Sequence, residues 1–184
     1  MMFGKNLGAV ETAKRIPVGS VGVEIGVWRG DSTALFLERA SHVHLVDPWA
    51  VTAYEDSDEF GDYYSYLQRY SKLVGSPDPR KFQQYYDAVY DCVRARFGDL
   101  VTIHRCKSED FFKRFSGLVD WVYIDGSHSF EGCNDDLHSA LSIVRPGGFI
   151  FGDDYVNKPG VTEAVNGFGR QFEVFGGNQY QIKV

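Results

Sequence analysis

The stretch 21–32, VGVEIGVWRGDS, constrains the fold of this chain more than any other. Its first five residues predict a buried strand, and its end predicts a helix that begins at Asp31 or Ser32. Between them, Gly26 and Gly30 accept backbone angles that other residues avoid, and they let a ligand approach the chain closely. Because the free N–H groups of the new helix face the same space, this turn predicts a binding place for a polar small molecule.

Strands and helices alternate along the rest of the chain. Further strands are predicted at 42–46, 100–104, 119–124 and 149–152, followed by a terminal hairpin at 171–184. Helices are predicted at 3–16, 31–40, 108–115, 129–144 and 162–168. A further helix is predicted after Pro77 and Pro79, where apolar residues from Phe82 to Phe97 recur at helical spacing. This alternation predicts an α/β fold in which a mainly parallel sheet of seven strands is covered by helices on both faces. Ligands of such sheets bind at the carboxyl ends of the strands.

The span between the second and third strands is unusually long. We interpret the chain as a single domain, 1–184, with a helical flap inserted at about 51–78. The flap mixes tyrosines with acidic residues, and the helix after it has apolar residues at helical spacing. Such a flap either covers a substrate or is a solvated helical addition, and the sequence leaves both interpretations open.

Composition and charge limit the class of protein. A net charge of -6 and a pI near 5.3 argue against binding of nucleic-acid phosphates, which normally requires a basic face. Cys92, Cys106 and Cys133 lie far apart, which indicates reduced thiols in a cytoplasmic protein rather than disulfides or a zinc site. No apolar run reaches the roughly 18 residues of a membrane helix, so no membrane partner is expected. A homo-oligomer is possible.

Polar side chains, mostly acidic, follow the ends of the predicted strands. They are Asp47 after the second strand, Ser108 and Glu109 after the third, Asp125 and His128 after the fourth, and Asp153 and Asp154 after the fifth. A carboxylate after the second strand suits the two hydroxyls of a ribose. The glycine turn differs from GxGxxG and the chain has no GKS or GKT, so a dinucleotide or a nucleoside triphosphate is disfavoured.

These motifs resemble those of class I S-adenosylmethionine-dependent methyltransferases, which have a Rossmann-like fold. The pattern Glu24-x-Gly26-x-x-x-Gly30-x-Ser32 is similar to the cofactor turn of their small-molecule O-methyltransferases. The segments VYIDGSHSFEG, RPGGFIFGDDY and GVTEAV resemble the macrocin O-methyltransferase group, which methylates sugar hydroxyls of natural products. The resemblance covers nearly the whole chain and is weakest in the flap.

The resemblance implies a role for each of these residues. Those implied to bind S-adenosylmethionine are Gly26, Gly30 and Ser32 at the methionine end, Glu24 in support, Asp47 at the ribose, Ser108 and Glu109 at the adenine, and Asp125. Those implied to bind magnesium are Asp125, Asp153 and Asp154. His128 matches the general base, and Asp125 is assigned to the catalytic group with it.

Chemistry supports a cation at this place. Carboxylates that converge on one point repel one another unless a hard cation or protons intervene. A bound cation lowers the pKa of a substrate hydroxyl, and His128 then removes the proton near neutral pH. Two simpler interpretations remain: Asp153 and Asp154 cap a turn, and His128 caps the helix that follows it.

We therefore expect a magnesium-dependent O-methyltransferase that acts on a small polyhydroxylated molecule, such as a sugar or a glycosylated metabolite. One alternative is a metal-independent methyltransferase of the same fold. Another is a cofactor-binding protein of this fold that transfers no methyl group, because a fold does not fix a function. Nucleic-acid methylation is not expected, because the fourth strand ends in IDGSH and the chain is acidic.

Overall fold

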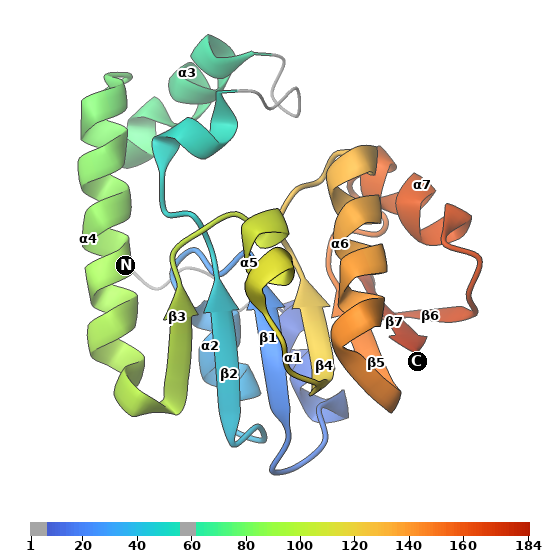
Figure 1. Cartoon of the computed structure of the whole chain (residues 1–184). Coiled ribbons are helices and arrows are strands. Elements are labelled where there is room, and N and C mark those ends of the chain that lie inside the picture. Colours follow the sequence, from blue (N-terminus) through green and yellow to red (C-terminus); the bar gives the residue numbers. More distant parts are fainter. Residues whose placement is uncertain (1–6, 56–61) are drawn as a thin grey trace.

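A computed structural model describes residues 7–55 and 62–184. Its centre is a seven-stranded sheet in the order β3-β2-β1-β4-β5-β7-β6 (Figure 1). The strands are β1 (Val21–Ile25), β2 (His42–Val46), β3 (Val101–His104), β4 (Val119–Ile124), β5 (Val144–Gly152), β6 (Phe172–Phe175) and β7 (Gln179–Lys183). The first five strands are parallel, and β7 joins β5 and β6 in antiparallel pairs. The predicted fold class is confirmed.

Helices cover both faces of this sheet. The α-helices are α1 (Leu7–Arg15), α2 (Asp31–Phe36), α3 (Tyr63–Val74), α4 (Pro79–Phe97), α5 (Ser108–Arg114), α6 (Phe130–Ile143) and α7 (Pro159–Gly167). Side chains of α1, α2 and α4 form one buried cluster with the sheet, and those of α5, α6 and α7 form another. Two short 3-10 helices, η1 (Val51–Tyr54) and η2 (Gly98–Leu100), lie in the connections. Within the described residues, no helix has the length and apolar character that crossing a membrane requires.

The small cluster beside α3 has its own apolar core. Val51, Tyr66, Leu67 and Phe82 are buried together, away from the two clusters of the sheet. Figure 1 places α3 beyond the carboxyl ends of β2 and β3. Residues 56–61 of the predicted flap lie outside the described residues.

The sequence analysis is wrong in detail at three boundaries, one of which is the start of α7 at Pro159 instead of residue 162. Helix α2 ends at Phe36 instead of about residue 40, and Gly30 caps it in a left-handed conformation with a φ of 71°. Neither Asp31 nor Ser32 is the capping residue, because the Ser32 hydroxyl turns inward to the protein core. Strand β5 begins at Val144, since the Arg-Pro-Gly-Gly segment that follows continues the strand rather than forming a loop.

Candidate functional site

The glycine turn after β1 joins the ends of three strands. Gly26 has a φ of 82°, and its N–H donates to the carbonyl oxygen of Val46 at 2.9 Å. The N–H of Asp125 donates to the carbonyl oxygen of Ile25 at 2.8 Å. A Cβ atom on Gly26 would lie 1.9 Å from the backbone oxygen of Asp125. The absence of a side chain at Gly26 therefore lets the ends of β1, β2 and β4 meet.

Glu24 holds the start of α2 against β1. Its side chain is fully buried and accepts hydrogen bonds from the hydroxyls of Ser32 and Thr33, the latter at 2.5 Å. Burial raises the pKa of this carboxyl group from 4.5 to about 8, against the opposing effect of the two hydroxyls. Glu24 therefore supports the turn from the protein core. The Ser32 hydroxyl donates its hydrogen bond to Glu24.

We expect Glu24→Gln to flatten the dependence of stability on pH. The folded protein keeps the Glu24 proton up to about pH 8, whereas the unfolded chain releases it near pH 4.5. Its contribution to stability is therefore greatest below pH 4.5 and is lost as pH rises, by up to about 1.4 kcal/mol per pH unit. Urea denaturation at about pH 5.5 and about pH 7.5 measures this slope, with exposed Glu38→Gln as the control. An unchanged slope in Glu24→Gln would contradict the assignment.

Asp47 organises the glycine turn from the end of β2. Its carboxylate accepts backbone N–H groups of Val27 at 3.0 Å, Trp28 at 2.9 Å and Trp49 at 2.7 Å. Burial raises the pKa of Asp47, although these three donors oppose the shift. A carboxylate has about four acceptor positions, so about one remains for a ligand. The sequence analysis expected two ribose hydroxyls here and missed this role in the turn.

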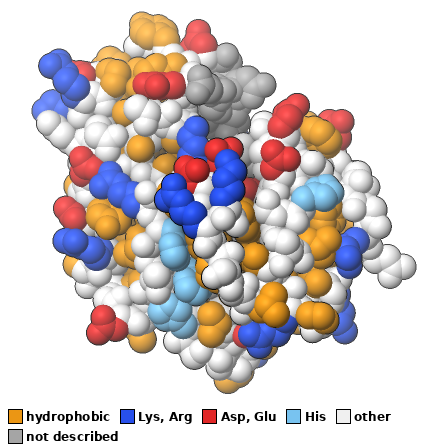
Figure 2. Space-filling view, in the orientation of Figure 1, with side chains coloured by type: hydrophobic (Ala, Val, Ile, Leu, Met, Phe, Trp, Pro, Cys, Tyr) orange, Lys and Arg blue, Asp and Glu red, His pale blue; other side chains and the backbone are white. Residues whose placement is uncertain are grey.

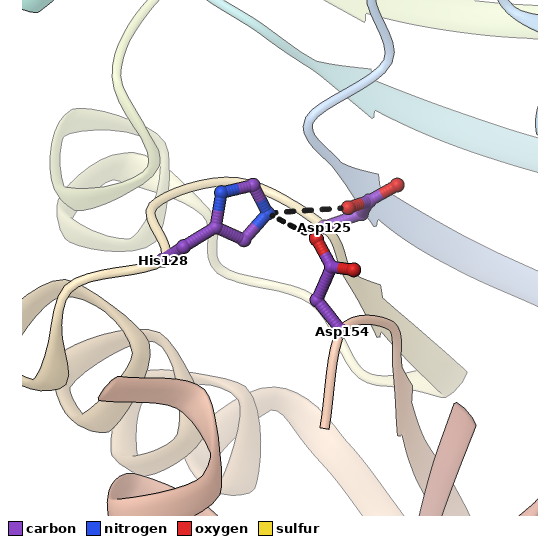
Figure 3. A group of neighbouring side chains, drawn as sticks. All are labelled: Asp125, His128 and Asp154. Atoms are coloured by element: carbon purple, nitrogen blue, oxygen red, sulfur yellow. Dashed lines mark ion pairs between the residues drawn. The ribbon is translucent and has the colours of Figure 1, made fainter. Parts of the chain in front are cut away.

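Three polar side chains meet beyond β4 and β5. His128 Nε2 lies 3.2 Å from Asp154 Oδ2 and 3.6 Å from Asp125 Oδ1 (Figure 3). One ligand atom from each of the three residues lies within 4.8 Å of the others. Asp154 reaches this position through a left-handed backbone with a φ of 63°. The fold thus brings Asp125, His128 and Asp154 together.

Asp153, which the sequence also predicts as a magnesium ligand, contacts the terminal hairpin. Its Oδ1 accepts hydrogen bonds from Asn178 Nδ2 at 2.9 Å and from the N–H of Asp154 at 2.6 Å. Asn178 Nδ2 also donates to Asp154 Oδ1 at 2.9 Å, so the hairpin that carries Asn178 contacts both carboxylates.

The electrostatics of this group favour a neutralising partner. Burial raises the pKa of Asp125 to about 6, His128 opposes this shift, and Asp153 and Asp154 add to it. Acidic groups at this density hold protons or a cation near neutral pH. The group therefore suits a divalent ion or a proton-transfer step.

A single cavity of about 830 Å³ connects the glycine turn with this group. The predicted site residues that line it are Gly26, Ser32, Asp47, Ser108, Glu109, Asp125, His128 and Asp154. Glu24, Gly30 and Asp153 are not among its lining residues. Tyrosines of η1, α3 and α4 line the opposite side. In Figure 2, Lys and Arg side chains surround acidic ones near the centre of the visible face.

The sequence analysis missed Asp136. This carboxyl group is 4% exposed, lines the cavity and is hydrogen-bonded to the side chain of Ser108. Burial raises its pKa to about 7. The signal was present in the sequence, because an acid at 136 lies on the apolar stripe of α6 with Cys133, Leu137 and Ala140. Asp136 fixes Ser108 at the edge of the cavity.

Comparisons with known proteins identify the family. A family model described as a methyltransferase domain matches residues 23–155. This range includes all of the predicted site residues that line the cavity, from Gly26 to Asp154. A search of curated proteins finds no match.

Solved structures share the fold at low sequence identity. The O-methyltransferase NovP has a TM-score of 0.55 and 19% identity over 96% of this chain and 76% of its own. CalS11, a TDP-rhamnose 3'-O-methyltransferase of calicheamicin biosynthesis, has a TM-score of 0.55 and 13% identity over 97% and 78%. A Streptococcus mutans protein solved with SAH has a TM-score of 0.59 and 8% identity over 100% and 99%. The chain thus belongs to the methyltransferase-domain family, and it is an S-adenosylmethionine-dependent methyltransferase of the Rossmann-like class.

Proposed function

We propose that this protein transfers the methyl group of S-adenosylmethionine to a hydroxyl of a small polyhydroxylated molecule, with help from a divalent cation and a histidine base. The observation that carries the proposal is the meeting of Asp125, His128 and Asp154 in the cavity that begins at the glycine turn. The methyl donor and the groups that activate a hydroxyl then share one enclosed space, as an in-line displacement requires.

The donor set fits a divalent cation. Asp125 and Asp154 offer carboxylate oxygens, which Mg²⁺ prefers, and the remaining positions are left to water and substrate. The raised pKa of Asp125 also indicates that this pair is more stable with a positive charge nearby. When bound, the cation would lower the pKa of a substrate hydroxyl and orient it.

His128 would take the proton of that hydroxyl. Its Nε2 lies between Asp125 and Asp154, and these carboxylates stabilise the imidazolium that forms when it accepts a proton. His128 lies in the short loop between the end of β4 at Ile124 and Ser129, the cap of α6, so elements on both sides hold its backbone. The remaining barrier is the displacement at the methyl carbon, for which alignment is the main contribution of the protein.

The cofactor would lie across the carboxyl ends of β1, β2 and β3. The methionine end would contact the turn from Gly26 to Gly30, and Asp47 would accept one ribose hydroxyl through its remaining acceptor position. Ser108, held by Asp136, and Glu109 would lie at the adenine.

The proposed acceptor is a sugar or a glycosylated metabolite in the cytoplasm. CalS11, which shares the fold, acts on a TDP-linked rhamnose according to its name, and this supports a sugar hydroxyl as acceptor. The net charge of -6 disfavours nucleic acid. We also propose that the region around η1 and α3 acts as the flap over the acceptor, because its tyrosines face the cofactor side across the cavity.

Methyl transfer with and without a chelator tests the proposal. With labelled S-adenosylmethionine and a panel of free sugars, nucleotide sugars and aryl glycosides, we expect a methylated hydroxyl and S-adenosylhomocysteine. EDTA should abolish the reaction and added Mg²⁺ should restore it. Turnover that EDTA leaves unchanged would favour the metal-independent alternative. Cofactor binding with no methylated product over the whole panel would favour a cofactor-binding protein.

A further inference from the structure

Three histidines lie on one face of the strands at the β3 edge of the sheet, apart from the acidic group. His42 and His44 are two residues apart on β2, so their side chains share a face, and His104 joins them from β3. Figure 2 shows histidine side chains as a surface patch on the face that carries β2 and β3 in Figure 1. The three histidines are only partly buried, so dissolved ions can reach the patch from the surface.

Two of these imidazoles present nitrogen atoms to each other. His44 Nδ1 lies 3.2 Å from His104 Nε2. Two nitrogen ligands of one tetrahedral ion, each at about 2.0–2.1 Å from it, stand roughly 3.3 Å apart. The two rings are now joined by a hydrogen bond, and their nitrogen separation is close to the one that a shared transition metal requires.

Neighbouring aromatic rings hold this pair in place. Phe115 packs edge-on against His44 with ring centroids 5.1 Å apart, and Phe111 packs against His104 at 4.8 Å. Both phenylalanines belong to or follow α5, which covers this part of the sheet. Partial burial lowers the pKa of His44 to about 4 and also lowers that of His104, so both rings are neutral at pH 7. Neutral imidazole is the form that binds metals.

We propose that His44 and His104 form a binding site for a nitrogen-preferring transition metal ion such as Zn²⁺, Ni²⁺ or Cu²⁺. His42 is the nearest candidate for a third ligand, because its ring centroid lies 5.2 Å from that of His44. Its Nε2 now contacts Thr102 Oγ1 at 2.9 Å, so it would join the pair by rotation of its side chain. On binding, the proton shared by the pair moves to the other nitrogen of its own ring, and both imidazoles stay neutral. This site offers imidazole nitrogens, whereas the group of Asp125 and Asp154 offers carboxylate oxygens that suit Mg²⁺. The two sites should therefore prefer different metal ions.

Zinc titration of the whole protein tests the site. Long-range ¹H–¹⁵N spectra of the imidazoles should show His44 and His104 signals shifting with about one equivalent of Zn²⁺ in the presence of excess Mg²⁺. In competition with a coloured zinc indicator, His44→Ala/His104→Ala should weaken zinc binding at least tenfold. The control is His138→Ala on α6, whose exposed ring packs against Phe168 and which should bind zinc as the wild type does.

Three results would overturn the site. They are a shift confined to the His128 signals, an unchanged affinity in the double variant, and no shift of His44 or His104 at micromolar zinc. The spectra of the wild-type protein decide the question even where the double variant fails to fold. Because none of these measurements uses methyl transfer, the outcome is independent of the proposed function.

Discussion

Gly26→Ala is expected to destabilise the protein by about 2–5 kcal/mol and to remove measurable binding of S-adenosylhomocysteine. The new Cβ would lie 1.9 Å from the Asp125 backbone oxygen, so the ends of β1 and β4 must separate. A left-handed alanine costs about 1–2 kcal/mol, and overpacking costs about 1–3 kcal/mol more. Denaturation in urea measures the first effect, and calorimetric titration with S-adenosylhomocysteine measures the second.

Gly19→Ala is the matched control for this prediction. Gly19 has a φ of 73°, close to that of Gly26, but a Cβ there meets no atom within 4 Å. Only the left-handed backbone is then penalised, so we expect a loss of about 1–2 kcal/mol and unchanged binding of S-adenosylhomocysteine. Equal effects of the two alanines would show that the close contact of Gly26 with Asp125 has no special importance.

Asp154→Asn is expected to lower methyl transfer about 100-fold while the affinity for S-adenosylhomocysteine changes less than about threefold. This loss corresponds to about 2.7 kcal/mol of transition-state stabilisation. Asparagine accepts the left-handed backbone at 154, so the substitution removes charge with little change of shape. Initial rates at saturating cofactor, with and without excess Mg²⁺, measure the effect.

Asp153→Asn distinguishes the role of Asp153 from that of the neighbouring Asp154. Both acids accept from Asn178, but Asp154 lines the cavity and contacts His128, so we expect replacement of Asp153 to cost less than about tenfold in rate. A larger loss for Asp153→Asn than for Asp154→Asn would mean that Asp153 is the more important of the two ligands that the sequence predicts.

Most of the fold follows from local sequence signals. The apolar runs at β1, β2 and β4 and the turn residues between them have strong periodicity, so their bounds agree with the structure. Strand β5 begins earlier than predicted because Pro146 and two glycines continue an extended chain, and the sequence pattern of such a segment also suits a loop.

The site was predictable only in part. The sequence places acidic residues at the strand ends, but the directions of Asp153 and Asp154 depend on a left-handed backbone at 154. Both also accept from Asn178, which comes from the distant hairpin. Asp47 has the same limitation, since its three N–H partners lie on two turns that meet only in the folded chain. Contacts between distant segments have no local signal.

The most direct test of the account is the anomalous scattering of a crystal grown with S-adenosylhomocysteine and Mn²⁺. We predict one strong manganese peak within about 2.3 Å of oxygen atoms of both Asp125 and Asp154, and the cofactor sulfur at the Gly26 turn facing that peak. A filled cofactor site with no manganese at these two carboxylates, or with the sulfur directed away from them, would contradict it.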